Sequence, residues 1–138
     1  MRYKDDAFGH ALKDYLQGKD VYEIIERDDG YIDATKSIGD YLAEFEEWPE
    51  IQKEAMNYVE CNVLDIGCGP GKHSLYLQKK GHEVLGIDIS PIVLEVCKER
   101  GIEKVKRMGI SEVDENLGTF DTILMLGNNF GLLENPDK

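Results

Sequence analysis

A glycine-rich turn between an apolar run and a helix is the part of this sequence best suited to hold a ligand. Residues 63–71 read V-L-D-I-G-C-G-P-G. A strand that turns sharply into a helix needs backbone angles that a Cβ forbids, and glycine also lets a ligand approach the main chain closely. The helix that begins near Lys72 directs its unpaired N–H groups towards this turn. The pattern therefore predicts a small-molecule site at the end of the first buried strand.

Asp88 supplies the second chemical feature. It ends the run G-I-D at residues 86–88, and it follows Gly67 by 21 residues. A carboxylate has two oxygens and suits the two hydroxyls of a ribose, and a gap of about 20 residues is the spacing that nucleotide-binding folds use. The two features together predict a site for a nucleoside-containing ligand.

The details of the turn discriminate between two kinds of nucleoside ligand. A dinucleotide site reads G-x-G-x-x-G and cradles a pyrophosphate, but here the third glycine position holds Lys72. Asp65 lies two residues before the first glycine. Its carboxylate would repel a pyrophosphate and attract an ammonium or a sulfonium group. The spacing therefore favours an S-adenosyl compound over a dinucleotide.

The motif D-I-G-C-G-P-G at residues 65–71 closely resembles motif I of the class I S-adenosylmethionine-dependent methyltransferases, and E-V-L-G-I-D-I-S at residues 83–90 is similar to their next motif. The resemblance covers roughly residues 62–133. It implies a Rossmann-like α/β fold with a doubly wound parallel sheet. It also implies S-adenosylmethionine as the cofactor and S-adenosylhomocysteine as the product.

The resemblance implies cofactor contacts along four segments of the chain. The expected contact residues are Asp65, Gly67, Cys68, Gly69, Gly71, Asp88, Ile89, Gly109, Ile110, Leu126, Gly127 and Asn128. The loop at residues 108–111 is expected to pack on the adenine, although the family's usual acid is missing there and Glu112 is the nearest one. The loop at residues 127–130, G-N-N-F, is similar to that of glycine N-methyltransferase-like small-molecule enzymes. Ordinary loop chemistry remains the alternative for its two asparagines.

The spacing of apolar residues and turn signals divides the chain into two segments. Residues 1–60 predict an N-terminal helical cap, with helices at 7–16 and 49–58, a helical face over 38–45 and a hairpin within 21–33. Residues 61–138 predict the cofactor-binding core. Its expected strands are 62–66, 83–88, 104–108 and 122–126, and its expected helices are 72–80 and 91–100. This alternation indicates a parallel sheet.

The methyltransferase family has seven strands, and the pattern gives four. We therefore expect the sheet to be incomplete after its fourth strand and the chain to be part of a longer enzyme. The unpaired edge of the fourth strand is then available for pairing with a second copy.

The composition of the chain restricts the classes of partner that it is expected to bind. The net charge is −12, and residues 1–60 carry 16 acids against 7 bases. Such a surface repels phosphate backbones, so a nucleic-acid partner is not expected. No apolar run approaches the ~20 residues of a membrane span, so no membrane association is expected either. The cysteines at 61, 68 and 97 have no metal-type spacing, which indicates a reduced, cytoplasmic protein without a metal site.

We expect a methyltransferase that acts on a small-molecule acceptor, with no catalytic base identified. Tyr22, Tyr31 and Trp48 are candidates for covering the site, with core packing as the alternative, and His73 is interpreted as a surface or packing residue. Four other functions stay open: methylation of a protein or larger acceptor, cofactor binding without turnover, another use of the same cofactor, and an NAD-type oxidoreductase, which Asp65 and Lys72 disfavour. The sequence does not identify the acceptor atom.

Overall fold

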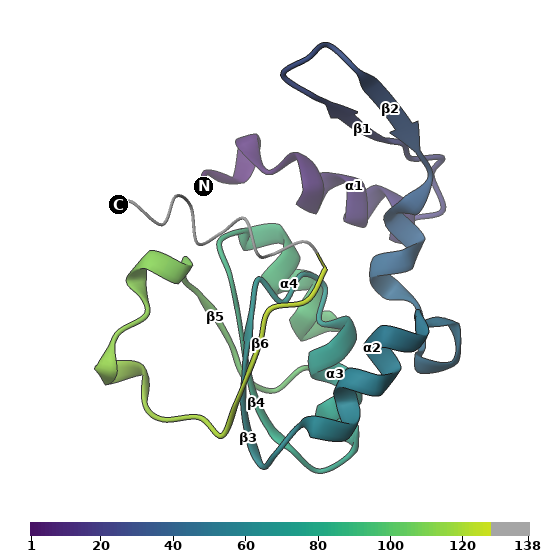
Figure 1. Cartoon of the computed structure of the whole chain (residues 1–138). Coiled ribbons are helices and arrows are strands. Elements are labelled where there is room, and N and C mark those ends of the chain that lie inside the picture. The colour runs from purple at the N-terminus through teal and green to yellow at the C-terminus, as the bar shows by residue number, and fades with distance from the viewer. Residues whose placement is uncertain (128–138) are drawn as a thin grey trace.

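A four-stranded parallel sheet forms the centre of the molecule. The computed structural model describes residues 1–127 of the chain. The strand order is β5-β4-β3-β6 (Figure 1). These strands are β3 (Asn62–Ile66), β4 (Glu83–Asp88), β5 (Val105–Arg107) and β6 (Thr122–Leu124). The chain winds outward from β3 to β5 and then returns to add β6 on the other side of β3, which confirms the doubly wound, Rossmann-like class.

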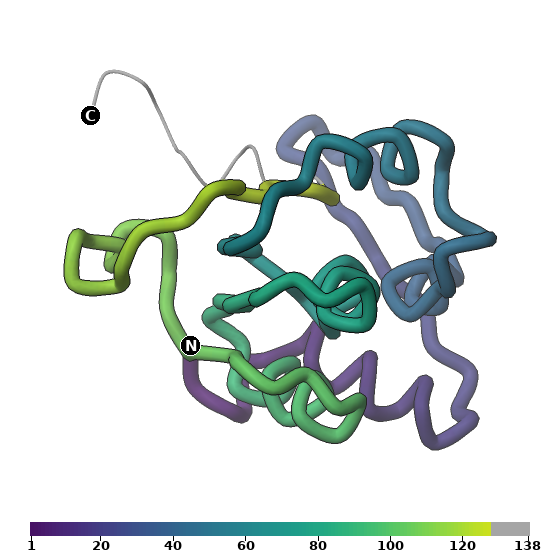
Figure 2. Tube along the Cα trace, turned by 90° about the horizontal axis from the view of Figure 1, so that it is seen from below, coloured from purple at the N-terminus to yellow at the C-terminus, as the bar shows by residue number. Residues whose placement is uncertain are grey.

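Different elements pack on the two faces of the sheet, as Figure 2 shows. The helices α3 (Lys72–Lys79) and α4 (Pro91–Glu99) lie on one face. The connection from β5 to β6 covers the other, with two short 3-10 turns, Ile110–Glu112 and Glu115–Leu117. Side chains alternate between the faces with the two-residue period of a strand. Val63 therefore packs against Leu77 of α3, whereas Leu64 packs in the cluster that the opposite connection covers.

The predicted bounds of the core elements are close to the observed ones. Both central strands have the predicted bounds, whereas β5 and β6 are shorter than expected. β5 pairs with residues 86–88 of β4, which ends at Asp88, so β4 has no residue left to pair beyond Arg107. β6 pairs with residues 63–65 of β3 and ends one residue before that strand does.

The N-terminal segment contains more than helices. Its elements are α1 (Ala7–Leu16), the antiparallel hairpin of β1 (Glu23–Glu26) and β2 (Ile32–Thr35), and α2 (Glu50–Ala55). The hairpin and α1 were predicted. The helical face at 38–45 forms 3-10 turns at Ser37–Leu42 and Phe45–Glu47 instead of an α-helix. Gly39 lies within this stretch, and a Cβ there would come within 2.6 Å of the Tyr15 hydroxyl.

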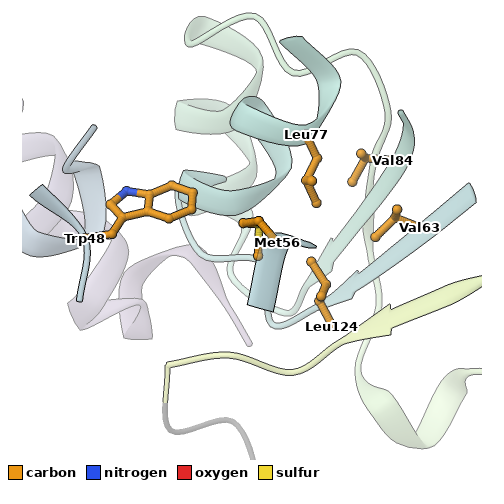
Figure 3. Packing of buried hydrophobic residues seen from close by; sticks show 6 residues of the cluster. All are labelled: Trp48, Met56, Val63, Leu77, Val84 and Leu124. Carbon is orange, nitrogen blue, oxygen red and sulfur yellow. The ribbon is translucent and has the colours of Figure 1, made fainter. Parts of the chain in front are cut away.

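The N-terminal segment shares hydrophobic clusters with the core. Leu12 of α1 and Ile38 pack with Val93 of α4. Trp48 packs with Met56 and with side chains of β3, β4, β6 and α3 (Figure 3). The indole N–H of Trp48 donates to the Ala43 carbonyl at 2.8 Å, and the side chain is buried. Trp48 is therefore a core residue, and the division of the chain at residue 60 remains a prediction.

The surface of the described part has two further features. No helix within residues 1–127 is long and apolar enough to cross a bilayer. β6 has β3 as its only neighbour among the described strands, and its Ile123 is exposed. Pairing of a second copy through this edge remains a prediction.

Candidate functional site

The glycine turn joins β3 to α3 through left-handed backbone. Gly67, Gly69 and Gly71 have φ angles of +65°, +55° and +79°. Residues with a Cβ rarely adopt these angles, so the turn requires glycine at all three positions. The Cys68 N–H donates to the Ile87 carbonyl at 3.0 Å, which ties the turn to β4.

Two of these glycines face different surroundings. A Cβ at Gly69 would meet no atom within 4 Å, so this glycine borders open space. A Cβ at Gly71 would lie 1.8 Å from Cδ1 of Ile102. Gly69 therefore leaves room for a ligand, whereas Gly71 leaves room for the protein core.

A cleft of about 340 Å³ opens at the carboxyl ends of the strands. Gly67, Cys68 and Gly69 form its floor, and Asp88 and Ile89 line it after β4. Further lining comes from the loop after β5 and from the end of β6: Met108, Gly109, Ile110, Leu126 and Gly127. Ligands of open α/β sheets bind at this edge, where the chain reverses its winding direction.

The Asp88 carboxylate is oriented by two main-chain donors. Gly69 N–H donates to Oδ2 at 3.1 Å, and Ser90 N–H donates to Oδ1 at 2.9 Å. Each oxygen keeps a further lone pair for a hydroxyl donor. Burial raises the pKa of Asp88, and the negative charge of Asp6 adds to the effect. The carboxylate is thus fixed in place and able to accept hydrogen bonds in the cleft.

Asp65 lies beneath the turn and is 2% exposed. Its Oδ2 accepts a hydrogen bond from the Ser74 hydroxyl at 2.7 Å. Burial raises its pKa to about 6, with a further contribution from the charge of Asp88. No ion pair among the described residues includes Asp65. Its negative charge is therefore uncompensated by a cationic side chain of this part of the protein.

Cys68 contributes a small neutral group to the floor. Its neighbour Cys97 and burial raise the pKa of the Cys68 thiol, and both thiols are directed at the Gly69 carbonyl. A neutral thiol is a weak nucleophile. The position is therefore that of a packing residue in a tight turn.

Lys72 and His73 begin α3 at one side of the cleft. The Lys72 ammonium lies 5.4 Å from the centre of the Trp48 ring, and burial lowers its pKa. His73 packs edge-on against Trp48, and its Nε2 lies 3.1 Å from Oε1 of Gln52. Burial lowers the pKa of His73 to about 4, and the charge of Lys72 adds to this. At neutral pH the imidazole is uncharged, in agreement with its interpretation as a packing residue.

Two aromatic residues of the N-terminal segment also border the cleft. Phe8 of α1 and Tyr41 meet edge to face, with ring centres 4.9 Å apart. The Tyr41 hydroxyl donates to Glu23 at 3.4 Å. Tyr22 and Tyr31, candidates for covering the site or for core packing, do neither: both are exposed on the hairpin and do not line the cleft. Phe8 and Tyr41 line it instead.

Comparison with known proteins identifies the family. The family model described as a methyltransferase domain matches residues 63–138. The chain belongs to the methyltransferase domain family. A solved S-adenosylmethionine-dependent methyltransferase from Bacteroides fragilis, in complex with S-adenosyl-L-homocysteine, is similar to 94% of the chain with a TM-score of 0.77 and 30% identity. The chain covers 53% of that structure.

Curated relatives of this methyltransferase domain match shorter stretches. An uncharacterized methyltransferase of Schizosaccharomyces pombe is 34% identical over 71 residues, which is 48% of the chain and 49% of that protein. The 18S rRNA (guanine-N(7))-methyltransferase of Bos taurus is 52% identical over 40 residues, which is 29% of the chain and 14% of that protein. The chain thus spans about half the length of the first of these relatives and much less of the second.

The methyltransferase fold brings most of the predicted site residues to one cleft. Two predicted contact residues do not line the cleft: Asp65, which is buried in β3, and Gly71, the last glycine of the turn. Their expected contact with a cofactor stays a prediction. Asn128 lies outside the described residues, as does the rest of the G-N-N-F loop after Gly127.

Phe8, Tyr41 and Asp6 are the residues that sequence reasoning missed. Phe8 and Tyr41 belong to helical apolar patterns, which predict core packing and do not reveal a position beside a cleft. Asp6 carried a usable signal, because an acid directly before an amphipathic helix is a typical N-cap. Its carboxylate also accepts hydrogen bonds from Ser90 and Ile92, which are 84 and 86 residues away in the sequence.

The two roles of the glycines lead to a stability prediction. Gly71→Ala should lower the free energy of unfolding by about 2–4 kcal/mol, because the new methyl group collides with Ile102 and the backbone is left-handed. Gly101→Ala is the matched control: its φ is +92°, and a Cβ there meets nothing within 4 Å. It should lose only about 1 kcal/mol. Urea unfolding of both variants measures the difference, and equal losses would contradict the packing role of Gly71.

Asp65 leads to a pH prediction. Because burial raises its pKa to about 6 in the folded state, the native protein retains a proton that the unfolded chain has released between about pH 4 and pH 6. The free energy of unfolding should therefore fall as the pH rises through this window, by up to about 3 kcal/mol from this group.

The variant Asp65→Asn lacks this titration and keeps an acceptor for Ser74. Its stability relative to the unaltered protein should rise between pH 4 and pH 6.5, as chemical denaturation at each pH measures. Asp33→Asn, on the exposed hairpin, is measured in parallel as the control for removing one acidic side chain. A constant offset for Asp65→Asn would show that Asp65 does not titrate in this range.

Proposed function

We propose that the protein to which this chain belongs is an S-adenosylmethionine-dependent methyltransferase that acts on a small-molecule acceptor. The observation that carries the proposal is the pairing of Gly69 with Asp88 in a methyltransferase domain. The main chain at Gly69 borders open space, and beside it the two oxygens of the Asp88 carboxylate are oriented by main-chain N–H groups. The similar Bacteroides fragilis methyltransferase was solved with S-adenosyl-L-homocysteine.

The residues of the cleft fit the parts of this ligand. Asp88 would accept the ribose hydroxyls, and Met108 and Ile110 would pack on the adenine. Gly67 and Gly69 would lie against the methionine portion, with Leu126 and Gly127 opposite. A Cβ at residue 69 would occupy the space that the ligand needs.

The buried acid suits the charge of the ligand. S-adenosylmethionine would supply a methyl group bonded to a positively charged sulfur, and transfer of that methyl to the acceptor would break the S–CH3 bond and release S-adenosylhomocysteine. Asp65 lies beneath the turn with its charge uncompensated among the described residues, and a positive charge above it would lower the cost of its ionisation. The protein's main tasks are then to align the acceptor and exclude water. Phe8 and Tyr41, which line the cleft from the N-terminal segment, would contribute to both.

The charge of the chain supports a small acceptor over a nucleic acid. The net charge is −12, and a surface of this sign repels a phosphate backbone. One relative is an 18S rRNA methyltransferase, but the shared stretch is 14% of that protein. Another, the magnesium-protoporphyrin O-methyltransferase of Rhodobacter capsulatus, is 31% identical over 70 residues and is named for a small-molecule substrate. A larger acceptor, binding without turnover and another use of the cofactor remain the alternatives.

Calorimetric titration with S-adenosylhomocysteine, and separately with NAD, tests the cofactor. We expect saturable binding of S-adenosylhomocysteine alone. Binding of NAD alone would overturn the proposal. The acceptor class is tested next, by incubating the full-length protein and labelled S-adenosylmethionine with a small-molecule extract, with total RNA and with total protein. Label that enters only RNA or protein would contradict a small-molecule acceptor.

Asp88 should contribute a large part of the affinity. Asp88→Asn should weaken binding of S-adenosylhomocysteine by about 1–3 kcal/mol, since a hydrogen-bonded charged group is lost. Asp114→Asn changes an exposed acid outside the cleft and serves as the control. Unchanged affinity of the Asp88 variant would remove this residue from the site.

Gly69→Val should abolish binding, because the side chain fills the space beside the main chain. Gly81→Ala is the control for backbone strain: its φ is +94°, and it lies at the far end of α3. Both variants are compared by titration with S-adenosylhomocysteine and by thermal unfolding. A Gly69→Val protein that still binds normally would show that the turn has a structural role only.

A further inference from the structure

A buried carboxylate outside the cleft joins the N-terminal segment to the site. Asp6 directly precedes α1 and is fully buried. Its Oδ1 accepts from the Gly9 N–H at 2.9 Å, and its Oδ2 accepts from the Ile92 N–H at 3.1 Å. One side chain therefore satisfies unpaired donors at the first turns of both α1 and α4.

The same carboxylate also holds Ser90. The Ser90 hydroxyl donates to Oδ2 of Asp6 and accepts from the Val93 N–H at 3.0 Å. The main-chain N–H of Ser90 donates to Oδ1 of Asp88 at 2.9 Å. Ser90 is thus held by Asp6 through its side chain and orients Asp88 through its backbone.

The contact between α1 and α4 leaves little freedom for Asp6 to move. A Cβ at Gly9 would lie 2.6 Å from Cβ of Ile92 and 2.6 Å from Oδ2 of Asp6. Phe8, two residues after Asp6, reaches the cleft. Docking of α1 therefore sets the positions of Phe8 and of the Ser90 main chain at the same time.

We propose that Asp6 is a positioning residue for ligand binding: by holding Ser90 it orients the Asp88 carboxylate, so that docking of the N-terminal segment and recognition of the ribose are coupled. This inference rests on the proposed function. A helix cap alone would give Asp6 a role in stability, whereas the Asp6–Ser90–Asp88 connection gives it a role in how the ribose is recognised.

The test uses two ligands, S-adenosylhomocysteine and its 2′-deoxyribose analogue, titrated calorimetrically into each variant. The unaltered protein should prefer the ribose form. Asp6→Asn keeps an acceptor for Gly9 but loses the charge that holds Ser90 and Ile92. It should weaken binding of S-adenosylhomocysteine about tenfold and reduce the preference for the ribose form, because Asp88 is no longer held in place.

Val84→Ala is the control for lost stability. Val84 is buried on β4 among Leu77 and Val63 and does not line the cleft. The substitution should lower the thermal stability and leave both the affinity and the ribose preference unchanged. Loss of preference in Asp6→Asn but not in Val84→Ala would separate positioning from general destabilisation.

Two further variants complete the test. Ser90→Ala breaks the connection from the other side and should reproduce the loss of ribose preference, which also covers the case in which Asp6→Asn does not fold. The double variant Asp6→Asn/Asp88→Asn should bind as Asp88→Asn does, because residues that act through one another are not additive.

The outcomes separate the two proposals. If the unaltered protein binds no S-adenosylhomocysteine, the proposed function fails and the inference fails with it. If the unaltered protein binds with a ribose preference that Asp6→Asn and Ser90→Ala retain, the inference is overturned and the proposed function stands. Losses that add fully in the double variant would likewise assign Asp6 a purely structural role.

Discussion

The hydrogen bond from the Gly69 N–H to Asp88 is the interaction on which the site depends. It joins the turn after β3 to the end of β4, and it forms only because the turn follows a left-handed path that brings the main chain of Gly69 towards the neighbouring strand. The same path brings Gly71 against the core, where Cδ1 of Ile102 lies 1.8 Å from the place a Cβ would take, so only glycine fits there. The parallel register, the packing of α4 and the glycine spacing are therefore parts of one constraint.

Three buried or partly buried carboxylates, those of Asp6, Asp65 and Asp88, lie at or near this hydrogen bond. Among the described residues none of them has an ion-pair partner. Asp6 and Asp88 are satisfied by hydroxyl and main-chain N–H donors, and Asp65 by the hydroxyl of Ser74. Such donors fix the direction of a carboxylate without neutralising it. The region under the cleft therefore keeps a negative potential, which stabilises a cationic ligand and costs folding free energy when the cleft holds none.

Local patterns predicted the parts of the structure that local physics decides. The bounds of β3 and β4 follow from apolar runs that end at a glycine turn and an acid, and the hairpin follows from Asp28-Asp29-Gly30 between two β-rich runs. The sequence could not separate Gly69 from Gly71, since both need left-handed backbone and only the fold shows which one faces Ile102. Trp48 illustrates the same limit, because an aromatic residue in a cap segment suits a site or a core equally well until its neighbours are known.

Contacts between distant residues account for what the sequence did not predict. Asp6 and Ser90 are 84 residues apart, and Phe8 and Tyr41 meet only because α1 and the turn at Ser37–Leu42 pack on the same side of α4. The parallel sheet supplies the glycine turn and Asp88. These features are compatible with many acceptors, because the fold and the cofactor do not fix the acceptor. The N-terminal segment supplies the aromatic side of the cleft. Docking of α1 brings Phe8 to the cleft, and the buried Asp6 carboxylate that fixes this docking also holds Ser90, whose main chain orients Asp88.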